Sequence, residues 1–270
     1  MSVELNPIAV VRCAVRDSKA MPPLGVPARL ELFPQYEPGL YRLEKHSHIW
    51  VLAWLGGAER DILQVTPRGV PEPAPEGLHG VFGVRSPARP NPIGLTAARI
   101  VRIDGASIDV DYLDFVDGTP ILDLKPYFVA RDLIFSARNE QIGRPGSREA
   151  LRESLLFQAQ RFHGEFCPGL ALGVRLFEDF RADVLGMMEP RELRVTVPMD
   201  PPCLIDTIMG MARASPGRGT LQFGPAKFVR FDAGSQAAEY MLLPGAPEEA
   251  ARILEAPGAV LYRRLRPALR

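Results

Sequence analysis

The stretch RSPARPNPIGLT, residues 85–96, combines two guanidinium groups with a backbone of little freedom. Its three prolines fix φ and remove backbone donors, so this part of the chain is not expected to join a sheet. Residues that precede proline are also held in extended conformations. Arg85 can pair with a carboxylate, and Gly94 allows a ligand to come close to the backbone. The pattern indicates either a rigid corner between strands or a surface with free carbonyls that holds a ligand.

A second dense stretch, DYLDFVDGTPILDLKPY, carries four aspartates around an Asp-Gly-Thr-Pro turn. Asp-Gly is a strong hairpin signal, so a structural role accounts for it. Carboxylates such as Asp114 and Asp117 beside exposed backbone can also receive a cationic or hydroxyl-bearing ligand. The residues by themselves leave both interpretations open.

A third set of residues has the chemistry of a metal site. FHGEFCPGLALGVR and the later CLIDTI resemble the FmdE family, and the resemblance implies that His163, Cys167 and Cys203 supply one imidazole and two thiols, a donor set that suits zinc. Two other interpretations remain. Cys167 precedes a proline that opens a predicted helix, which lowers a thiol pKa and makes a reactive thiolate. Alternatively, both cysteines are small apolar groups within a core, in a domain that has lost its metal.

The length, charge and composition of the chain limit the classes of protein to which it can belong. A length of 270 residues favours two domains. The formal net charge of zero argues against a large basic surface for nucleic acid. Three cysteines are too few for a disulfide framework and indicate a reducing, cytoplasmic compartment. No stretch approaches the roughly 18 apolar residues of a membrane-spanning helix, and the first residues do not form a signal peptide.

The first half of the chain consists of strand-length segments separated by turns, which is typical of a barrel or sandwich. The predicted strands are 7–12, 28–33, 47–55, 80–84, 96–103 and 107–113. A polar, glycine-containing stretch at 136–149 indicates a linker. We therefore expect a β-barrel domain over residues 1–135.

The second half changes to helical spacing mixed with short strands, so an α+β domain is expected over residues 150–270. The predicted helices are 149–164, 168–186, 203–213 and 246–256. The predicted strands are 192–197, 220–223, 227–231, 239–243 and 259–265. The fold class is therefore multi-domain, with an all-β barrel followed by an α+β domain.

Taken together, the first two stretches resemble a known family. GVFGVRSPARPNPIGLTAARI followed by LDFVDGTPILDLKPY is similar to the tRNA threonylcarbamoyladenosine N6-methyltransferase family, called TrmO, TsaA or YaeB. The segments PIAVVR and LELFPQYEPGLYRLEKHSHIWVLAWL agree, so the resemblance covers about residues 5–131 in the family's order. It implies a β-barrel that binds S-adenosylmethionine between the protomers of a homodimer. It also implies transfer of the methyl group to N6 of a modified adenosine in tRNA.

The resemblance implies a set of cofactor-binding residues. The positions that match the family's motifs are Arg85, Asn91, Leu95, Asp117, Gly118 and Thr119. Arg85 would pair with the cofactor carboxylate, Asp114 or Asp117 would bind ribose or ammonium, and Trp54 would stack on the cofactor. No general base is assigned, because methyl transfer depends mainly on in-line placement.

The acceptor stays open between tRNA and a small molecule. The family's bacterial tRNA enzymes carry PRQ and HQ motifs where this chain has MPPLG (21–25) and WLGG (54–57). Residues 1–135 hold 14 Lys and Arg against 16 Asp and Glu, a net charge of −2. A third hypothesis is a binding protein that senses cofactor or metal without catalysis.

The second half resembles the FmdE family, which takes its name from formylmethanofuran dehydrogenase. FHGEFCPGLALGVR and the later CLIDTI carry the resemblance. The matching positions are His163, Cys167, Pro168, Gly169, Cys203, Asp206, Gly219 and Lys227. The family's second histidine is replaced by Glu165, and its later Gly-Cys-Thr turn lacks the cysteine here. The resemblance implies a zinc site at His163, Cys167 and Cys203.

Overall fold

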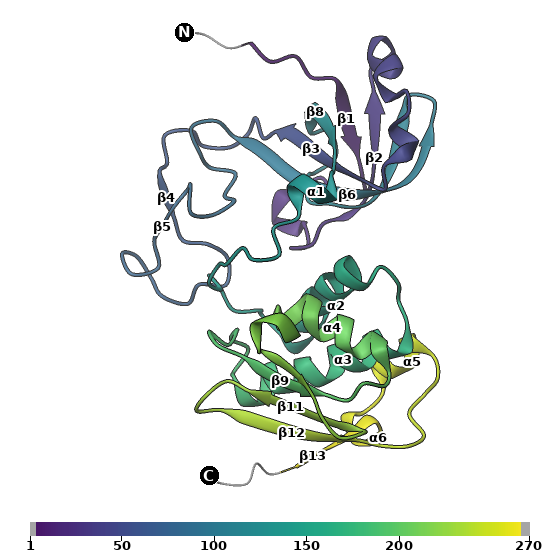
Figure 1. The fold of residues 1–270 in the computed structure, drawn as a ribbon. Coiled ribbons are helices and arrows are strands. Elements are labelled where there is room, and N and C mark those ends of the chain that lie inside the picture. Colours follow the sequence, from purple (N-terminus) through teal and green to yellow (C-terminus); the bar gives the residue numbers. More distant parts are fainter. Residues whose placement is uncertain (1–3, 266–270) are drawn as a thin grey trace. The chain divides into compact units, whose positions relative to one another are not determined.

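The computed structural model of the chain describes residues 4–265, which form two compact units (Figure 1). The first unit holds the described residues up to Pro67 together with Glu72–Ser136. The second holds Arg68–Pro71 together with the described residues from Ala137 onward. In this part of the chain, no helix has the length and apolar character needed to cross a membrane. The sequence-based division into a domain (1–135), a linker (136–149) and a second domain (150–270) stays a prediction about which parts of the chain fold independently.

The first unit is a closed barrel of six antiparallel strands, as predicted, in the order β1-β2-β7-β6-β3-β8. Alternation along the strands fills the barrel interior, because Ile49, Val51 and Ala53 of β3 point into the buried core while their neighbours face outward. The barrel strands are β1 (Ala9–Arg12), β2 (Val26–Leu32), β3 (His48–Trp54), β6 (Ile93–Asp104), β7 (Ser107–Leu113) and β8 (Pro120–Pro126).

Short helices accompany the barrel strands. Three 3-10 turns join strands, at Ser18–Ala20, Pro34–Leu40 and Leu43–Lys45, and the one-turn helix α1 (Val129–Asp132) follows β8. The strand β8 had no counterpart in the sequence prediction, because prolines stand at both of its ends. It closes the barrel by pairing with β1 and with β3.

The predicted strand 80–84 is wrong. Only His79–Gly80 form a strand, β5, which pairs with β4 (Gln64–Val65) outside the barrel. After it the chain turns, with the Gly83 amide donating to the Gly80 carbonyl at 2.8 Å. The carbonyls of Val81 and Val84 accept hydrogen bonds from Arg89 and so cannot form a strand ladder.

Gly94 is buried in β6 beneath the ring of Phe115, so the expectation that a ligand reaches the backbone there is wrong. A Cβ at this position would lie 2.5 Å from Phe115 Cε1. We expect Gly94→Ala to lower the free energy of unfolding of the barrel by about 1–3 kcal/mol, the usual cost of overpacking. Both tryptophans lie in β3, so tryptophan fluorescence during urea unfolding measures this change. In the control Gly57→Ala the added Cβ meets nothing within 4 Å, and equal midpoints for the two variants would contradict the prediction.

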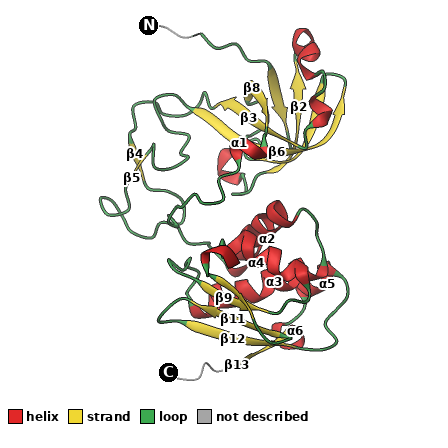
Figure 2. Cartoon of the chain, viewed as in Figure 1, coloured by secondary structure: helices red, strands yellow, loops and turns green. Residues whose placement is uncertain are grey.

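The second unit is a five-stranded sheet with its main helices packed on one face (Figure 2). The strand order is β10-β9-β11-β12-β13, and the β10–β9 pair is parallel. Its strands are β9 (Arg194–Val197), β10 (Leu221–Phe223), β11 (Phe228–Asp232), β12 (Ala237–Leu242) and β13 (Tyr262–Leu265). Its helices are α2 (Arg148–His163), α3 (Pro168–Asp179), α4 (Pro202–Ala212), α5 (Ala250–Glu255) and α6 (Gly258–Leu261).

The predicted α+β class is therefore confirmed, with differences in detail. The predicted helix 246–256 is shorter in the structure, where α5 spans Ala250–Glu255. The predicted helix 168–186 ends as α3 at Asp179 and continues as a π-helical turn, Phe180–Val184. The predicted last strand is split, because Pro257 starts the single turn α6 before the chain becomes extended in β13. A further 3-10 turn, Pro216–Arg218, precedes β10.

A carboxylate lies at the centre of the second unit. Glu178 of α3 is 0% exposed. Its oxygens lie 2.6 Å from Arg148 Nε and 2.7 Å from Arg152 Nε, both on α2. Arg175 Nε lies 3.2 Å away, and its Nη1 donates to three carbonyls at the end of α5. Burial acts to raise the pKa of Glu178, but hydrogen bonds from Arg152 and Arg148 outweigh it and hold that pKa below its ordinary value.

Candidate cofactor and metal sites

Strands β3 and β6 bring two of the predicted cofactor residues to one face of the barrel. The register pairs Leu52 with Leu95 and Trp54 with Ile93, so all four side chains point away from the core. Leu95 is 41% exposed, and the Arg85 guanidinium lies 3.5 Å from its carbonyl oxygen. This weak contact leaves the exposed Arg85 side chain able to pair with an anion.

The proline-rich loop lies outside the strands, as predicted, but its carbonyls are not free. Arg89 Nε donates to Ser86 at 2.8 Å, and Arg89 Nη2 donates to Val84 at 2.6 Å. The two arginines of the loop thus differ in role, because Arg89 fixes the loop from within while Arg85 projects from it. Asn91 is exposed, and its carbonyl accepts from the Ile93 amide at 2.7 Å.

Arg60 was not identified from the sequence, although it connects the loop to Trp54. Its guanidinium lies 5.8 Å from the centre of the Trp54 ring, and its Nε donates to the Pro90 carbonyl at 2.9 Å. One face of Trp54 is therefore occupied by a cation. An aromatic residue followed within six positions by arginine is too common a pattern to have indicated this contact.

Asp114 follows β7 and is exposed. Its Oδ1 accepts a hydrogen bond from Thr96 Oγ1 on β6, a partner that the sequence did not indicate. This bond fixes the carboxylate on the β6 side of the barrel and leaves Oδ2 for a ligand.

The Asp-Gly-Thr turn, residues 117–119, forms hydrogen bonds with β1 and with the residue that follows it. The Cys13 amide donates to Asp117 Oδ1 at 3.3 Å, and the Gly118 amide donates to the Val11 carbonyl at 2.8 Å. Gly118 has φ +81°, which favours glycine. Thr119 is buried, and its hydroxyl donates to Val116 at 2.7 Å. The predicted cofactor residues therefore fall into a β3–β6 group and a β1–β8 turn.

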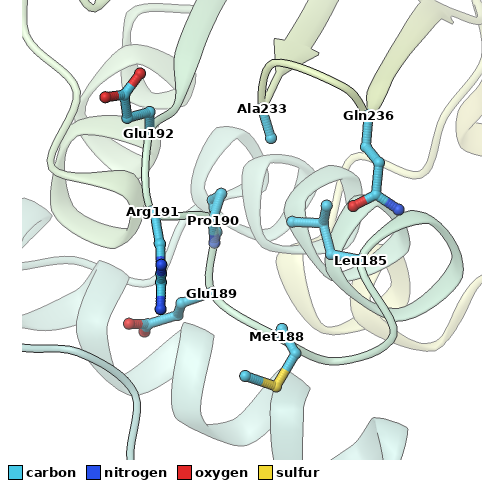
Figure 3. Close-up of a pocket in the computed structure, with 8 residues that line it drawn as sticks. All are labelled: Leu185, Met188, Glu189, Pro190, Arg191, Glu192, Ala233 and Gln236. Atoms are coloured by element: carbon cyan, nitrogen blue, oxygen red, sulfur yellow. The ribbon is translucent and has the colours of Figure 1, made fainter.

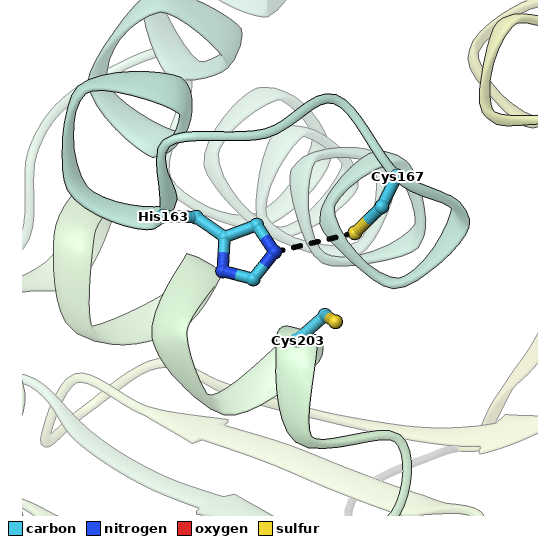
Figure 4. Close-up of side chains that lie close together, drawn as sticks. All are labelled: His163, Cys167 and Cys203. Atoms are coloured by element: carbon cyan, nitrogen blue, oxygen red, sulfur yellow. Dashed lines mark hydrogen bonds between the residues drawn. The ribbon is translucent and has the colours of Figure 1, made fainter.

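In the second unit, His163, Cys167 and Cys203 come together (Figure 4), with their donor atoms all within 4.8 Å of one another. His163 ends α2, and Gly164 at φ +88° reverses the chain. Cys167 then caps the N-terminus of α3, where its Sγ accepts from the Leu170 amide at 3.4 Å. Cys203 lies in the first turn of α4.

Two glycines of α3 allow α4 to approach closely enough to complete the group. A Cβ on Gly169 would lie 2.7 Å from Cys203 Cβ, and one on Gly173 would lie 2.6 Å from Thr207 Cγ2. Their spacing of four residues puts both glycines on the same face of the helix. This contact brings Cys203 next to Cys167 across 36 positions of sequence.

The donor distances suit zinc. His163 Nε2 lies 3.4 Å from Cys167 Sγ, close to the roughly 3.5 Å between imidazole and thiolate ligands on a tetrahedral zinc ion. Burial and the neighbouring Cys167 thiol raise the pKa of Cys203. A cation would offset this by stabilising the thiolates. The residues present therefore fit a zinc ion.

A separate cavity of about 440 Å³ lies elsewhere in the second unit (Figure 3). It is bordered by Leu185, by the segment Met188–Glu192 and by Ala233 and Gln236 at the turn between β11 and β12. Arg191 lies between Glu189 and Glu192 on its rim, so opposite charges are mixed there. None of the residues predicted from the sequence lines it.

Sequence comparison assigns each unit to a family. Residues 16–133 match the family described as tRNA-methyltransferase O N-terminal domain, TrmO_N. Residues 162–240 match the family described as FmdE, Molybdenum formylmethanofuran dehydrogenase operon. The two ranges contain every cofactor and metal residue predicted above.

Three relatives illustrate the similarity. A "Probable S-adenosyl-L-methionine-binding protein" of Archaeoglobus fulgidus is 39% identical over 65% of this chain and 48% of its own length. This chain thus spans about half of that relative. An "S-adenosyl-L-methionine-binding protein" of the same organism is 36% identical over 51% of this chain and 98% of its own. A "tRNA (adenine(37)-N6)-methyltransferase" of Mus musculus is 36% identical over 38% of this chain and 24% of its own.

Proposed function

Because this chain belongs to the TrmO family of S-adenosylmethionine-dependent methyltransferases, we propose that its first unit binds S-adenosylmethionine and transfers the methyl group to N6 of threonylcarbamoyladenosine in tRNA. The observation that carries the proposal is the family match over residues 16–133, which includes all eight predicted cofactor residues. The bound cofactor supplies a methyl group on a positively charged sulfur.

The side chains of the β3–β6 face suit the parts of that cofactor. Arg85 pairs with the carboxylate tail. Trp54 offers the ring face not taken by Arg60 to the adenine, and Leu95 adds an exposed apolar contact. Asp114 Oδ2 accepts from ribose or ammonium. The rigid loop around Asn91 keeps these groups in place, and placement supplies much of the rate in methyl transfer.

The Asp-Gly-Thr turn contributes differently in this proposal. The Asp117 carboxylate has one oxygen bound to the Cys13 amide, and Oδ2 lies 3.6 Å from Arg16 Nε. Gly118 is exposed, so a cofactor group can approach its backbone. Thr119 is buried and acts by holding the turn.

Arg85→Ala is expected to weaken S-adenosylmethionine binding by about 10–100-fold, since a hydrogen-bonded charged pair contributes about 1.5–3 kcal/mol. Isothermal titration calorimetry on the full chain measures this change. The matched control is Arg29→Ala, which removes an arginine that pairs with Asp109 on the outside of the barrel. No cofactor binding by the unaltered protein, or equal affinities for Arg85→Ala and the unaltered protein, would count against the assignment.

Transfer of labelled methyl from S-adenosylmethionine into total tRNA tests the acceptor. The name of the mouse relative, a tRNA (adenine(37)-N6)-methyltransferase, supports tRNA adenine as the acceptor. The net charge of −2 over residues 1–135 favours a small molecule instead. Label in a small-molecule extract and not in tRNA would support that alternative. Cofactor binding with no transfer to either would support a sensing protein.

We propose further that the second unit binds zinc through His163, Cys167 and Cys203, which is supported by their donor atoms lying within 4.8 Å of one another.

We also propose that the protein is a homodimer and that it lies in the cytoplasm. Phe82, which is 84% exposed, and Leu95 support an apolar contact beside the cofactor residues. The free state of all three cysteines supports a reducing compartment.

A further inference from the structure

We propose that the His163–Cys167–Cys203 site is open: a bound zinc ion takes its fourth ligand from outside the protein, and this ligand is a small organic thiolate. The inference rests on the zinc site proposed above and goes beyond it, because it assigns the site a role in ligand binding and not in holding the fold.

The number of donors is the first argument. In residues 4–265, the group of His, Cys, Asp and Glu side chains that can share one ion has three members. Structural zinc sites have four protein ligands, whereas zinc sites that bind substrate keep three and leave one position open. The set of one histidine and two cysteines is one of the combinations found in open sites.

The packing of the second unit is the second argument. The three donor residues are half-buried, and of these Cys167 packs against the edge of the core. Leu155 of α2, Phe177 of α3 and Phe231 of β11 are at most 2% exposed. Contact between α3 and α4 is made by Gly169 against Cys203 at the donors and by Gly173 against Thr207 one turn further along α3. The fully buried core of the second unit contains none of the three donors.

Asp206 is a positioning residue in this arrangement. Its Oδ2 lies 3.1 Å from His163 Nδ1, so the ring donates there and presents Nε2 toward Cys167. Asp206 is 50% exposed and the His163 side chain 13% exposed. The carboxylate thus fixes the ring from the solvent side and does not occupy the fourth position.

The surroundings of the site select an anionic, soft ligand. The N-termini of α3 and α4 meet at the two cysteines, and their positive ends favour negative charge. Zinc with two thiolates has no net charge, so a third thiolate adds a single negative charge beside these helix ends. Thiolate is also a ligand that zinc prefers. Phe166 stands next to Cys167 in the chain and is 43% exposed, so it offers an apolar side chain to an organic group.

Absorption spectroscopy of the full chain loaded with cobalt(II) tests this inference, with 2-mercaptoethanol as the probe. We expect the near-ultraviolet thiolate-to-cobalt band to grow by about half on saturation, because the number of thiolates rises from two to three. A spectrum that does not change with the thiol, while cobalt stays bound, would overturn the open site and leave the metal site standing. Absence of cobalt binding would overturn both.

Asp206 variants test the positioning role. Asp206→Ala is expected to weaken cobalt binding by about 10–100-fold and to shift the visible bands. Asp206→Asn keeps an acceptor for His163 Nδ1 and should retain most of the affinity. The metal-free proteins should unfold at nearly the same urea concentration, since the Asp206 side chain is half-exposed. Equal cobalt affinity and equal spectra for Asp206→Ala and the unaltered protein would overturn this role.

Discussion

Glu178→Gln is expected to lower the free energy of unfolding of the second unit by about 3–5 kcal/mol, the usual cost of breaking a buried ion pair. The carboxylate is 0% exposed and receives Arg148, Arg152 and Arg175 within 3.2 Å. Glutamine has nearly the same shape, so the loss comes from the charge. The arginines would then be left partly buried without their common partner.

Urea unfolding followed by far-ultraviolet circular dichroism measures this effect, because the long helices all belong to the second unit. Tryptophan fluorescence serves as an internal reference, since Trp50 and Trp54 lie in the barrel. Glu153→Gln is the matched control, as it removes an exposed carboxylate from α2. Equal circular dichroism midpoints for the two variants would contradict the prediction.

The ion pairs of Glu178 also predict that the stability of the second unit depends on pH. The pKa of Glu178 in the folded protein lies below its ordinary value of 4.5. The carboxylate therefore contributes its full stabilisation above about pH 4.5 and loses it as the pH falls through the lowered folded pKa. The difference in unfolding free energy between unaltered protein and Glu178→Gln should be constant near neutral pH and shrink below pH 4.5. A difference that grows on acidification would refute this assignment.

Cys203→Ser is expected to lower the zinc affinity of the full chain by more than about 100-fold, so that purified protein no longer carries one zinc per chain. Removing a residue that hydrogen-bonds to a metal ligand already lowers metal affinity by about 10–100-fold. Removing a thiolate ligand itself lowers the affinity further. Cys167→Ser should behave in the same way, because it removes the other thiolate, whose Sγ lies 3.4 Å from His163 Nε2. Elemental analysis and competition with a chromophoric chelator measure both.

Cys13→Ser supplies the control for these variants. Cys13 is the third free cysteine and lies in the barrel, where its thiol donates to backbone carbonyls. It should leave the zinc content unchanged. If Cys203→Ser retained one zinc per chain, the two cysteines would be small apolar groups and the zinc proposal would be lost, together with the open site.

The sequence by itself determined the classes of structure and the candidate chemistry. Alternation in residues 48–54 and 107–113 is local information, so these two of the six barrel strands could be predicted from it. The helical spacing of Leu151, Leu155 and Ala159 identified α2 in the same way. The motifs around Arg85 and Asp117, and the His163, Cys167 and Cys203 set, were also recognisable, because each depends on residue type and order.

Only the tertiary structure decided which of these groups are available to a ligand. Arg85 and Arg89 are equivalent by sequence pattern. In the structure Arg89 donates to the Ser86 and Val84 carbonyls, whereas Arg85 makes a weak contact of 3.5 Å with the Leu95 carbonyl. Gly94 is covered by Phe115, and Asp117 holds an amide of β1. Cys203 reaches Cys167 because two glycines let α3 and α4 touch. The partners of Gly94, Asp117 and Cys203 come from segments distant in sequence, and local pattern carries no information about that packing. The carbonyls that Arg89 binds are near in sequence, but only the folded loop decides which of its two arginines reaches them.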